Sequence, residues 1–198
     1  SFFCFCSVQI SAEIYDLSEV VVTAELRDSK LIDQSGSTTV LSEGNLREVS
    51  AQHLEDALNS VPNLNFSGGT SRARFFQIRG VGERSQYVEP INPSVGLLMD
   101  DIDFTGVANA ATMLDIAQVE VLRGPQGTLH GANAMAGLIN LKSNEPQADP
   151  FNAVSVGIGN YDHHSFKFVS TGPLASNSVL YRFAFGSNES NGSIKNQF

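Results

Sequence analysis

The chain has 198 residues, enough for one hydrophobic core of good size or for a small domain and part of another. Its formal net charge is -9 and its isoelectric point is about 4.8. This charge argues against a partner with a phosphate backbone, since nucleic-acid-binding proteins usually carry a basic face. A solvated acidic surface is the simpler interpretation.

The opening run, SFFCFCSVQISA, is apolar and contains both cysteines of the chain, Cys4 and Cys6. Its length and composition are typical of the hydrophobic region of a signal peptide, so we expect a partial signal peptide at residues 1–12. A buried strand is the alternative. No later segment approaches the roughly 18 apolar residues that a membrane-spanning helix requires, so a membrane would have to be crossed by strands.

The next segment, residues 13–37, contains a short β-branched run at 20–23 among polar and charged residues. A run of this kind cannot fold stably by itself. It can add as a strand to the sheet edge of a partner, with main-chain hydrogen bonds supplying the affinity. The alternative is an edge strand of the domain that follows, and these residues alone favour neither.

Residues 38–146 predict a compact α+β domain built from short elements. TTVL predicts a strand. Ser50 is placed to cap a helix over 51–61, and Pro62 ends it. The apolar residues of this helix recur at helical spacing: Leu54, Leu58 and Val61.

Further along, RFFQIRG predicts a strand that ends at Gly80, and VGLLMDDIDF predicts two short strands that turn at Asp100 and Asp101. Together with Asp103, these aspartates resemble a calcium loop, but the glycine and the closing glutamate of an EF-hand are absent. A turn with solvated carboxylates is therefore the better interpretation.

The stretch VEVLRGPQGTLHGANAMAGLINLKS, residues 119–143, places glycines and a proline between two runs that alternate like strands. It lacks the glycine spacing of the phosphate-binding loops, and His130 has no second metal ligand at a workable spacing. No Ser-His-Asp arrangement or G-x-S-x-G elbow is present. We therefore predict no enzyme activity, no catalytic residue, no metal and no cofactor, and we assign the glycines to tight turns and close backbone approach.

From Ala153 onward the pattern changes to strict alternation, in VSVGIG, SFKFVS and VLYRFAFG, with His163 and His164 expected in a hairpin loop. Two environments produce such strands: a soluble sandwich, and an outer-membrane barrel whose outer face meets lipid. Aromatic residues on one face, with Gly, Ser, Ala and Arg on the other, favour the barrel.

Five stretches, in order, resemble the successive elements of the plug domain of TonB-dependent outer-membrane receptors: SEVVVTA, LEDALNSVPNLNF, FFQIRGVG, VGLLMDDIDF and the glycine-rich stretch. The resemblance covers residues 18–143. It implies an α+β plug domain followed by the first antiparallel strands of a transmembrane β-barrel. Barrels of this family have about 22 strands, so we expect this chain to be an N-terminal fragment.

The resemblance also implies site residues. The TonB box, which pairs by strand addition with TonB, corresponds to Glu19, Val20, Val21, Val22, Thr23 and Ala24. Arg79 and Arg123 match two plug arginines that face carboxylates of the barrel wall. The structural turns correspond to Gly80, Gly124, Pro125, Gly127, Gly131, Asn133 and Gly137. In the polar loop after the IRG motif, Arg84, Gln86 and Tyr87 are candidates for ligand contact, with a solvated loop as the alternative.

The implied function is TonB-dependent active transport of a scarce ligand, above all a ferric siderophore, with the plug gating the barrel; haem, cobalamin and carbohydrate stay open. The implied partners are TonB with ExbB and ExbD, the ligand and outer-membrane lipid, without nucleic acid. The implied location is the outer membrane of a Gram-negative bacterium, with residues 13–37 in the periplasm and barrel strands at 147–198. A secreted, soluble β-rich binding module without transport is the alternative.

Overall fold

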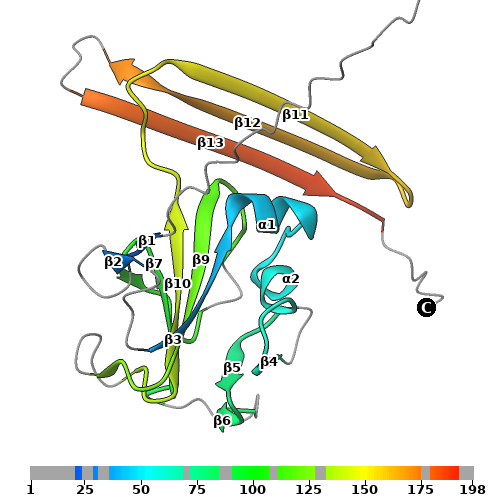
Figure 1. Cartoon of the computed structure of the whole chain (residues 1–198). Helices are drawn as coiled ribbons and strands as arrows, with labels where there is room; N and C mark the ends of the chain where they lie inside the picture. Colours follow the sequence, from blue (N-terminus) through cyan, green and yellow to red (C-terminus); the bar gives the residue numbers. More distant parts are fainter. Residues whose placement is uncertain are drawn as a thin grey trace, which may run out of the picture.

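The computed structural model describes residues 21–23, 29–30, 36–68, 72–84, 91–107, 111–127, 133–174 and 179–191. It contains a domain built around a mixed sheet and three long strands that cross one end of that domain (Figure 1). The expected signal peptide at residues 1–12 lies outside the described residues. Among the helices of the described part, none is long and apolar enough to span a membrane.

A five-stranded sheet in the order β3-β9-β10-β7-β8 organises the domain. Its strands are β3 (Ser37–Ser42), β9 (Ile116–Arg123), β10 (Gly137–Ser143), β7 (Val95–Met99) and β8 (Ile102–Asp103). The sheet is mixed, because β10 runs parallel to β7 and antiparallel to β9. Residues 137–141 of β10 are all buried, as expected for a central strand that is covered on both faces.

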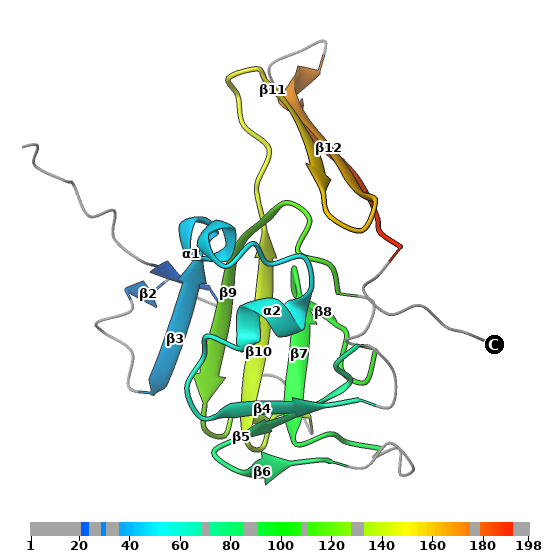
Figure 2. The ribbon, with the colours of Figure 1, turned by 90° about the vertical axis from the view of Figure 1, so that its right-hand side faces the viewer.

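One face of this sheet carries two short helices and a second sheet of three strands (Figure 2). The second sheet consists of β4 (Leu64–Ser67), β5 (Phe75–Ile78) and β6 (Val81–Gly82). The predicted strand in RFFQIRG is thereby confirmed as β5. The two layers enclose the main hydrophobic core, which includes Leu54, Leu58, Phe76, Ile78, Leu97, Val121 and Ile139.

The helical region differs from the prediction of a single helix over 51–61. The structure has two helices instead, α1 (Glu43–Glu48) and α2 (Leu54–Leu58). The predicted cap at Ser50 is wrong, because Ser50 lies beyond α1 in a left-handed conformation with φ of 50°. This conformation turns the chain between the two helices.

Local side-chain contacts explain where each helix begins. The carboxylate of Asp56 accepts the amides of Gln52 at 3.1 Å and His53 at 2.9 Å, so the first turn of α2 is organised around Asp56. α1 begins after Ser42, whose hydroxyl accepts the amide of Asn45 at 3.4 Å. Side chains that satisfy free amides in this way stabilise helix starts.

The predicted hairpin of β7 and β8 is confirmed, with Asp100 and Asp101 at its turn. Both aspartates have positive φ, 48° and 66°. Aspartate tolerates this region better than most residues, and two such residues in succession match the twist of a tight hairpin. The Asp100 carboxylate also accepts the amide of Ser143 at 2.9 Å, which ties the turn to the end of β10.

The second part of the molecule is an antiparallel sheet of β11 (Phe151–Gly159), β12 (His163–Leu174) and β13 (Val179–Glu189). Its strands alternate as predicted. Large apolar side chains on the face turned away from the domain stay exposed, for example Val156 at 68% and Ile158 at 81%. On that face Phe166 packs against Phe185, with ring centroids 6.2 Å apart.

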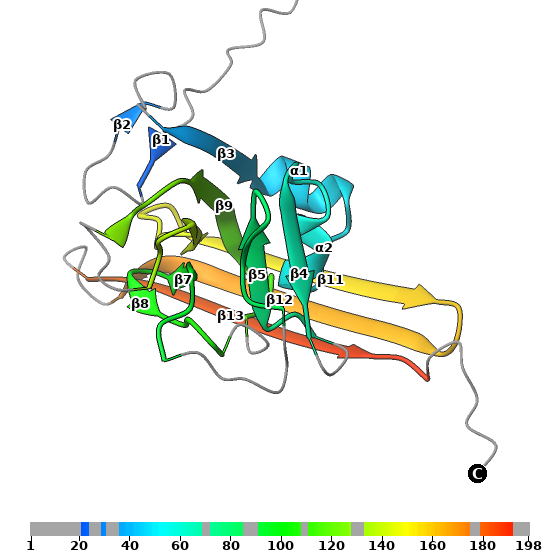
Figure 3. The same cartoon turned by 90° about the horizontal axis from the view of Figure 1, so that it is seen from below.

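The opposite face of these strands turns toward the domain, and Figure 3 shows the strands running side by side across it. A cleft of about 490 Å³ separates the two parts, and its lining includes Glu43, Arg47, Asp115, Lys167 and Asn188. The expected hairpin loop at His163 and His164 is wrong: both lie in β12, because the chain already turns at residues 160–162, where Tyr161 and Asp162 have positive φ.

Candidate functional site

The predicted coupling segment lies against β9. Of its six residues the structure describes Val21, Val22 and Thr23, whereas Glu19, Val20 and Ala24 lie outside the described residues. β1 (Val21–Val22) pairs antiparallel with β2 (Ser29–Lys30) in a small sheet separate from the five-stranded one. The side chain of Val22 is fully buried. The segment is therefore extended and docked, but it is not an edge strand of the main sheet.

A buried carboxylate holds this segment. Glu120 of β9 has no exposed surface, and its Oε1 accepts the Thr23 amide at 2.8 Å and the Thr23 hydroxyl at 3.1 Å. Gln118 donates its Nε2 to the same Oε1 at 2.6 Å and to the Val21 carbonyl at 3.1 Å. Asn140 donates its Nδ2 to Glu120 Oε2 at 3.1 Å. Side chains of β9 thus bind the backbone of the segment, and Asn140 of β10 holds one of them, Glu120.

Sequence reasoning missed this network. A signal was present, since Glu120 and Asn140 are polar residues inside the apolar runs VEVL and LINL, and a buried charge requires hydrogen-bonding partners. Their contact depends on the register of β9 against β10, which places Asn140 opposite Glu120. Neither run reveals that register by itself.

Arg79 lies in the turn after β5 and Arg123 ends β9, yet the two are close enough for the charge of Arg79 to act on Arg123. Arg123 donates NH1 to the Ser37 hydroxyl at 3.2 Å and NH2 to the Thr39 hydroxyl at 2.7 Å and the Pro62 carbonyl at 3.2 Å. Burial, together with the positive charge of Arg79, lowers the pKa of Arg123 from its ordinary value. Among the described residues, no carboxylate pairs with either arginine, and the buried Nε of Arg123 has no hydrogen-bond partner.

Three of the predicted turn glycines, Gly80, Gly124 and Gly137, lie where the backbone favours or requires glycine. Gly124 follows β9 with φ of 127°, a conformation that residues with a side chain rarely adopt. At Gly137 a Cβ would collide with the Leu122 carbonyl and with the side chain of Ile78. The absence of a side chain therefore allows β10 to begin against both β9 and the second sheet.

Gly80 lies apart from the residues that follow Gly124. Gly80 has φ of 81° in the tight turn between β5 and β6, next to Arg79 at 53°. Pro125 and Gly127 follow Gly124, and a Cβ at Gly127 would have open space around it. Gly131 lies outside the described residues.

Asn133 holds a carboxylate of the β7–β8 hairpin. Its Nδ2 donates to Asp103 Oδ2 at 3.4 Å, while Asp103 Oδ1 accepts the Thr105 amide at 2.8 Å. Burial by itself raises the pKa of Asp103, but the hydrogen bonds from Thr105 and Asn133 outweigh it and lower this pKa below its ordinary value of 3.8. The glycine-rich stretch is thus linked to the hairpin through Asp103.

Hydrogen bonds between Glu83 and Ser94 join the two sides of the predicted ligand loop. Of the three candidate contacts, Arg84 is described and exposed, whereas Gln86 and Tyr87 lie outside the described residues. The carboxylate of Glu83 accepts the Ser94 amide at 3.0 and 3.1 Å and the Ser94 hydroxyl at 2.7 Å. These bonds hold Glu83 and Ser94 together on the two sides of the loop.

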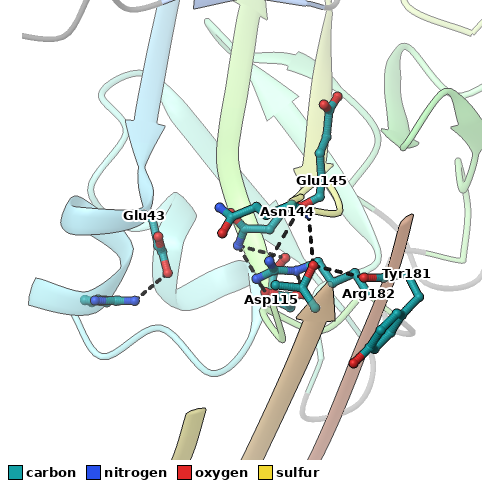
Figure 4. A network of polar contacts seen from close by, with 9 residues as sticks. Glu43, Asp115, Asn144, Glu145, Tyr181 and Arg182 are labelled. Carbon is teal, nitrogen blue, oxygen red and sulfur yellow. Dashed lines mark hydrogen bonds and ion pairs between the residues drawn. The ribbon is translucent and has the colours of Figure 1, made fainter. Parts of the chain in front are cut away.

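The domain and the three-stranded sheet are joined by an ion pair (Figure 4). Arg182 of β13 donates Nε and NH2 to the Asp115 carboxylate at 2.6 and 2.5 Å, and each side chain is 13% exposed. The Asn144 side chain donates to Asp115 Oδ1 at 3.1 Å. Arg182 also donates to the Glu145 carbonyl at 3.5 Å. Sequence alternation places Arg182 on the inner face but does not reveal its partner.

The described residues contain no group of three or more His, Cys, Asp or Glu side chains arranged to hold a metal ion. The described residues provide four features instead: a segment held on β9, a loop whose two ends are joined by hydrogen bonds, a pair of neighbouring cations, and a cleft of mixed lining beside an ion-paired junction. Such contacts can be made and released without covalent chemistry.

Comparisons with known proteins agree with this architecture. The family model described as the TonB-dependent Receptor Plug Domain matches residues 30–138. The chain is 30% identical over 168 residues to the pesticin receptor of Yersinia pestis, covering 84% of this chain and 24% of that protein. It is 30% identical over 187 residues to the vitamin B12 transporter BtuB of Vibrio vulnificus strain CMCP6, covering 91% of this chain and 29% of that protein.

Among solved structures, the ferric yersiniabactin uptake receptor FyuA from Yersinia pestis matches with a TM-score of 0.61 at 30% identity, covering 71% of this chain and 22% of that one. The fold and its contacts define a plug domain that carries the first strands of a barrel wall. The chain belongs to the TonB-dependent receptors. It spans about a quarter of the length of the curated relatives it matches. Membership identifies β11 to β13 as barrel strands rather than part of a soluble sandwich.

Proposed function

We propose that this chain is the plug and first wall strands of a transporter that imports a scarce ligand across the outer membrane, with energy supplied through TonB. The observation that carries the proposal is the docked segment at residues 21–23, which is extended and held mainly by side chains of β9. A partner strand can replace such contacts by strand addition. TonB would act on this segment together with ExbB and ExbD, which use the proton gradient.

The proposed organisation has a signal peptide at residues 1–12, a periplasmic segment at 13–37, the plug at 38–146 and the wall from 147 to 198. The exposed apolar face of β11 to β13 supports contact with outer-membrane lipid, because apolar and aromatic side chains there have no protein cover among the described residues. The inner face, with Arg182 and Lys167, would face the plug and the lumen.

Transport requires a plug that seals the barrel but can move. The cleft between the plug and the wall strands supports this role, because it leaves part of their boundary unpacked and its mixed polar and apolar lining gives water room to enter when the two parts separate. Arg79 and Arg123 would bind carboxylates elsewhere on the wall. The buried Nε of Arg123, which has no partner among the described residues, supports a further acceptor at that position.

A ferric siderophore is the ligand class that we propose, bound over the loop that contains Arg84, Gln86 and Tyr87. Names of relatives support it: a ferric yersiniabactin uptake receptor and a catecholate siderophore receptor are among the proteins to which this chain is similar. Vitamin B12 is the second candidate, favoured by the similarity to BtuB over 91% of this chain.

The test uses the full-length receptor that contains this chain, expressed in a strain lacking its own siderophore and B12 receptors. Uptake of radiolabelled ferric yersiniabactin, a ferric catecholate and cyanocobalamin is measured with Val21→Pro and, as the matched control, Val21→Ala. Proline removes a backbone donor and blocks strand addition, so it should abolish uptake while ligand binding persists. Alanine should retain most uptake. Normal uptake by the proline variant would contradict TonB coupling through this segment.

A further inference from the structure

Lys167 is a cation on the inner face of the wall strands that lacks a counter-charge among the described residues. It lies in β12, the middle strand of the three, and lines the cleft. Its neighbours directly across are Ser155 of β11 and Gly186 of β13, so neither adjoining strand places a carboxylate opposite it. The ammonium group therefore points into the cleft with donors to spare.

The other charged side chains of the cleft lining are matched by ion pairs. Glu43 pairs with Arg47 at 2.6 Å, and Asp115 pairs with Arg182 at 2.5 Å. Because these pairs neutralise each other, Lys167 gives the cleft a surplus of positive charge. A cleft concentrates the field of such a charge more than an open surface does. The cleft therefore favours an anion, although the whole chain has a net charge of -9.

Hydroxyl and apolar side chains complete the lining. The Cβ atoms of Ser155 and Lys167 are about 5 Å apart as a cross-strand pair, and Ser165 is two positions along the same face. On the plug side the lining includes Leu46 and Met113. An anionic group can thus accept from the ammonium and the hydroxyls while an apolar part contacts the plug. The volume of about 490 Å³ lies within the usual range for small-molecule sites.

Contacts along β13 keep this space open. Three inner-face residues of β13 meet plug side chains: Arg182 meets Asp115, Gly186 meets Leu114, and Asn188 meets Gln52. β11 and β12 contribute lining residues, among them Ala153 and Val169. The cleft is therefore a space beneath β11 and β12, beside the strand that holds the plug.

We propose that this cleft is a second ligand site, in which Lys167, Ser155 and Ser165 bind the negatively charged part of the transported chelate. The site rests on the proposed function, because its ligand is the one that the receptor would import. It is separate from the predicted ligand loop: β6, which precedes that loop, lies at the far end of the domain from the wall strands (Figure 1).

The lining defines the class of ligand as an anionic metal chelate with aromatic arms. Iron(III) bound by three catecholate groups carries a triple negative charge, and its rings present apolar faces. The charge matches the Lys167 ammonium, since hydrogen bonds between ionised partners are the strong ones. The rings match the apolar side chains of Leu46 and Met113.

The first measurement tests the charge of the cleft. Ala153→Cys, in a full-length receptor with no other accessible thiol, is treated with an anionic and with a cationic methanethiosulfonate. Lys167→Gln should lower the ratio of the anionic rate to the cationic rate about tenfold, because a nearby positive charge is lost. Arg72→Gln is the matched control, since Arg72 precedes β5 and lies outside the lining. It should leave the ratio unchanged.

The second measurement tests binding with the iron(III) tris-catecholate complex as the probe. In the purified full-length receptor, the complex should protect the thiol at position 153 from a neutral maleimide. Lys167→Gln should raise the concentration that gives half-protection about tenfold, the loss expected for one charge-assisted hydrogen bond. Lys167→Arg keeps the charge and should retain most of the protection. Gln147→Cys lies outside the lining, so its labelling should be equal in all variants and unaffected by the complex.

An unchanged rate ratio in Lys167→Gln, or the same protection with and without Lys167, would overturn the cleft site. TonB-dependent uptake without any protection at position 153 would also overturn it, and would leave the proposed transport standing. Protection that depends on Lys167 in a receptor without TonB-dependent uptake would support the site and contradict the proposed function. Protection together with uptake that slows several-fold in Lys167→Gln supports both.

Discussion

Two arginines of the plug and wall are in opposite electrostatic situations. Arg182 reaches inward from β13 and meets the Asp115 carboxylate in a two-bond ion pair. Arg123, at the end of β9, has two hydroxyls and a carbonyl as acceptors, and its Nε has none among the described residues. The junction with the wall thus contains a full charge pair, whereas the end of β9 carries a cation that has only neutral acceptors among the described residues.

The largest effect on the free energy of unfolding is expected at the Asp115–Arg182 ion pair. Asp115→Ala would leave the Arg182 guanidinium, with its side chain 13% exposed, facing the plug without a counter-charge. We expect a loss of about 2–3 kcal/mol in the free energy of unfolding of the plug, below the value for a fully buried pair because some solvent remains. Urea unfolding followed by hydrogen exchange of β9 amides measures it. Arg182→Met in the same background should recover part of the loss, and additive single effects would contradict the pair.

Substitution of Arg123 should have a smaller effect on the free energy of unfolding. Arg123→Met removes three hydrogen bonds to neutral acceptors and should cost about 1–2 kcal/mol by the same measurement. Arg123→Lys keeps the charge but not the forked geometry, and should recover only part of that cost. A larger loss of unfolding free energy in Arg123→Met than in Asp115→Ala would contradict this order. It would indicate that Arg123 has a charged partner on the wall.

A single acceptor can be removed to sharpen the same contrast. Thr39→Val deletes the hydroxyl that accepts Arg123 NH2 at 2.7 Å and preserves the β-branched shape in β3. The expected cost is about 0.5–1.5 kcal/mol of unfolding free energy. Thr38→Val is the matched control on the same strand and should be close to neutral. Equal effects of the two substitutions would show that the Thr39 bond contributes nothing.

The smallest effect on the free energy of unfolding is expected at Asp103. This carboxylate resembles Arg123 in that its charged form is stabilised by neutral hydrogen-bonding groups. Its pKa in the folded state is lowered from 3.8 by hydrogen bonds that outweigh burial. The resulting stability is present above pH 3.8 and is lost as the pH falls through 3.8 toward the folded-state pKa. As the pH is lowered from about 5 to 2.5, the free energy of unfolding should therefore fall less steeply in Asp103→Asn than in the unsubstituted protein. An unchanged slope would contradict the assignment.

The parts of the molecule that could be predicted from the sequence are those set by neighbouring residues. The alternation in β11 to β13 and the turn at Asp100 and Asp101 are local, and both are confirmed. The helix predicted over 51–61 is shorter, because Asp56 accepts two backbone amides and α2 begins at Leu54, later than a cap at Ser50 would place it. The docking of Thr23 on Glu120 depends on contacts between residues far apart in sequence, which no local pattern contains.

The short connection between the plug and the wall has a kinetic consequence. Residues 144–150 join β10 to β11. The connection is held at its start by the Asn144 amide on the Asp115 carbonyl at 3.0 Å and at its middle by the Gln147 amide on the Thr171 hydroxyl at 2.9 Å. A tether of this length keeps the plug at a local concentration of roughly millimolar or above near its wall site. If the plug separates from the wall strands during the proposed transport, contacts such as Asp115–Arg182 would set how often it does so, and the connection would set how quickly it returns.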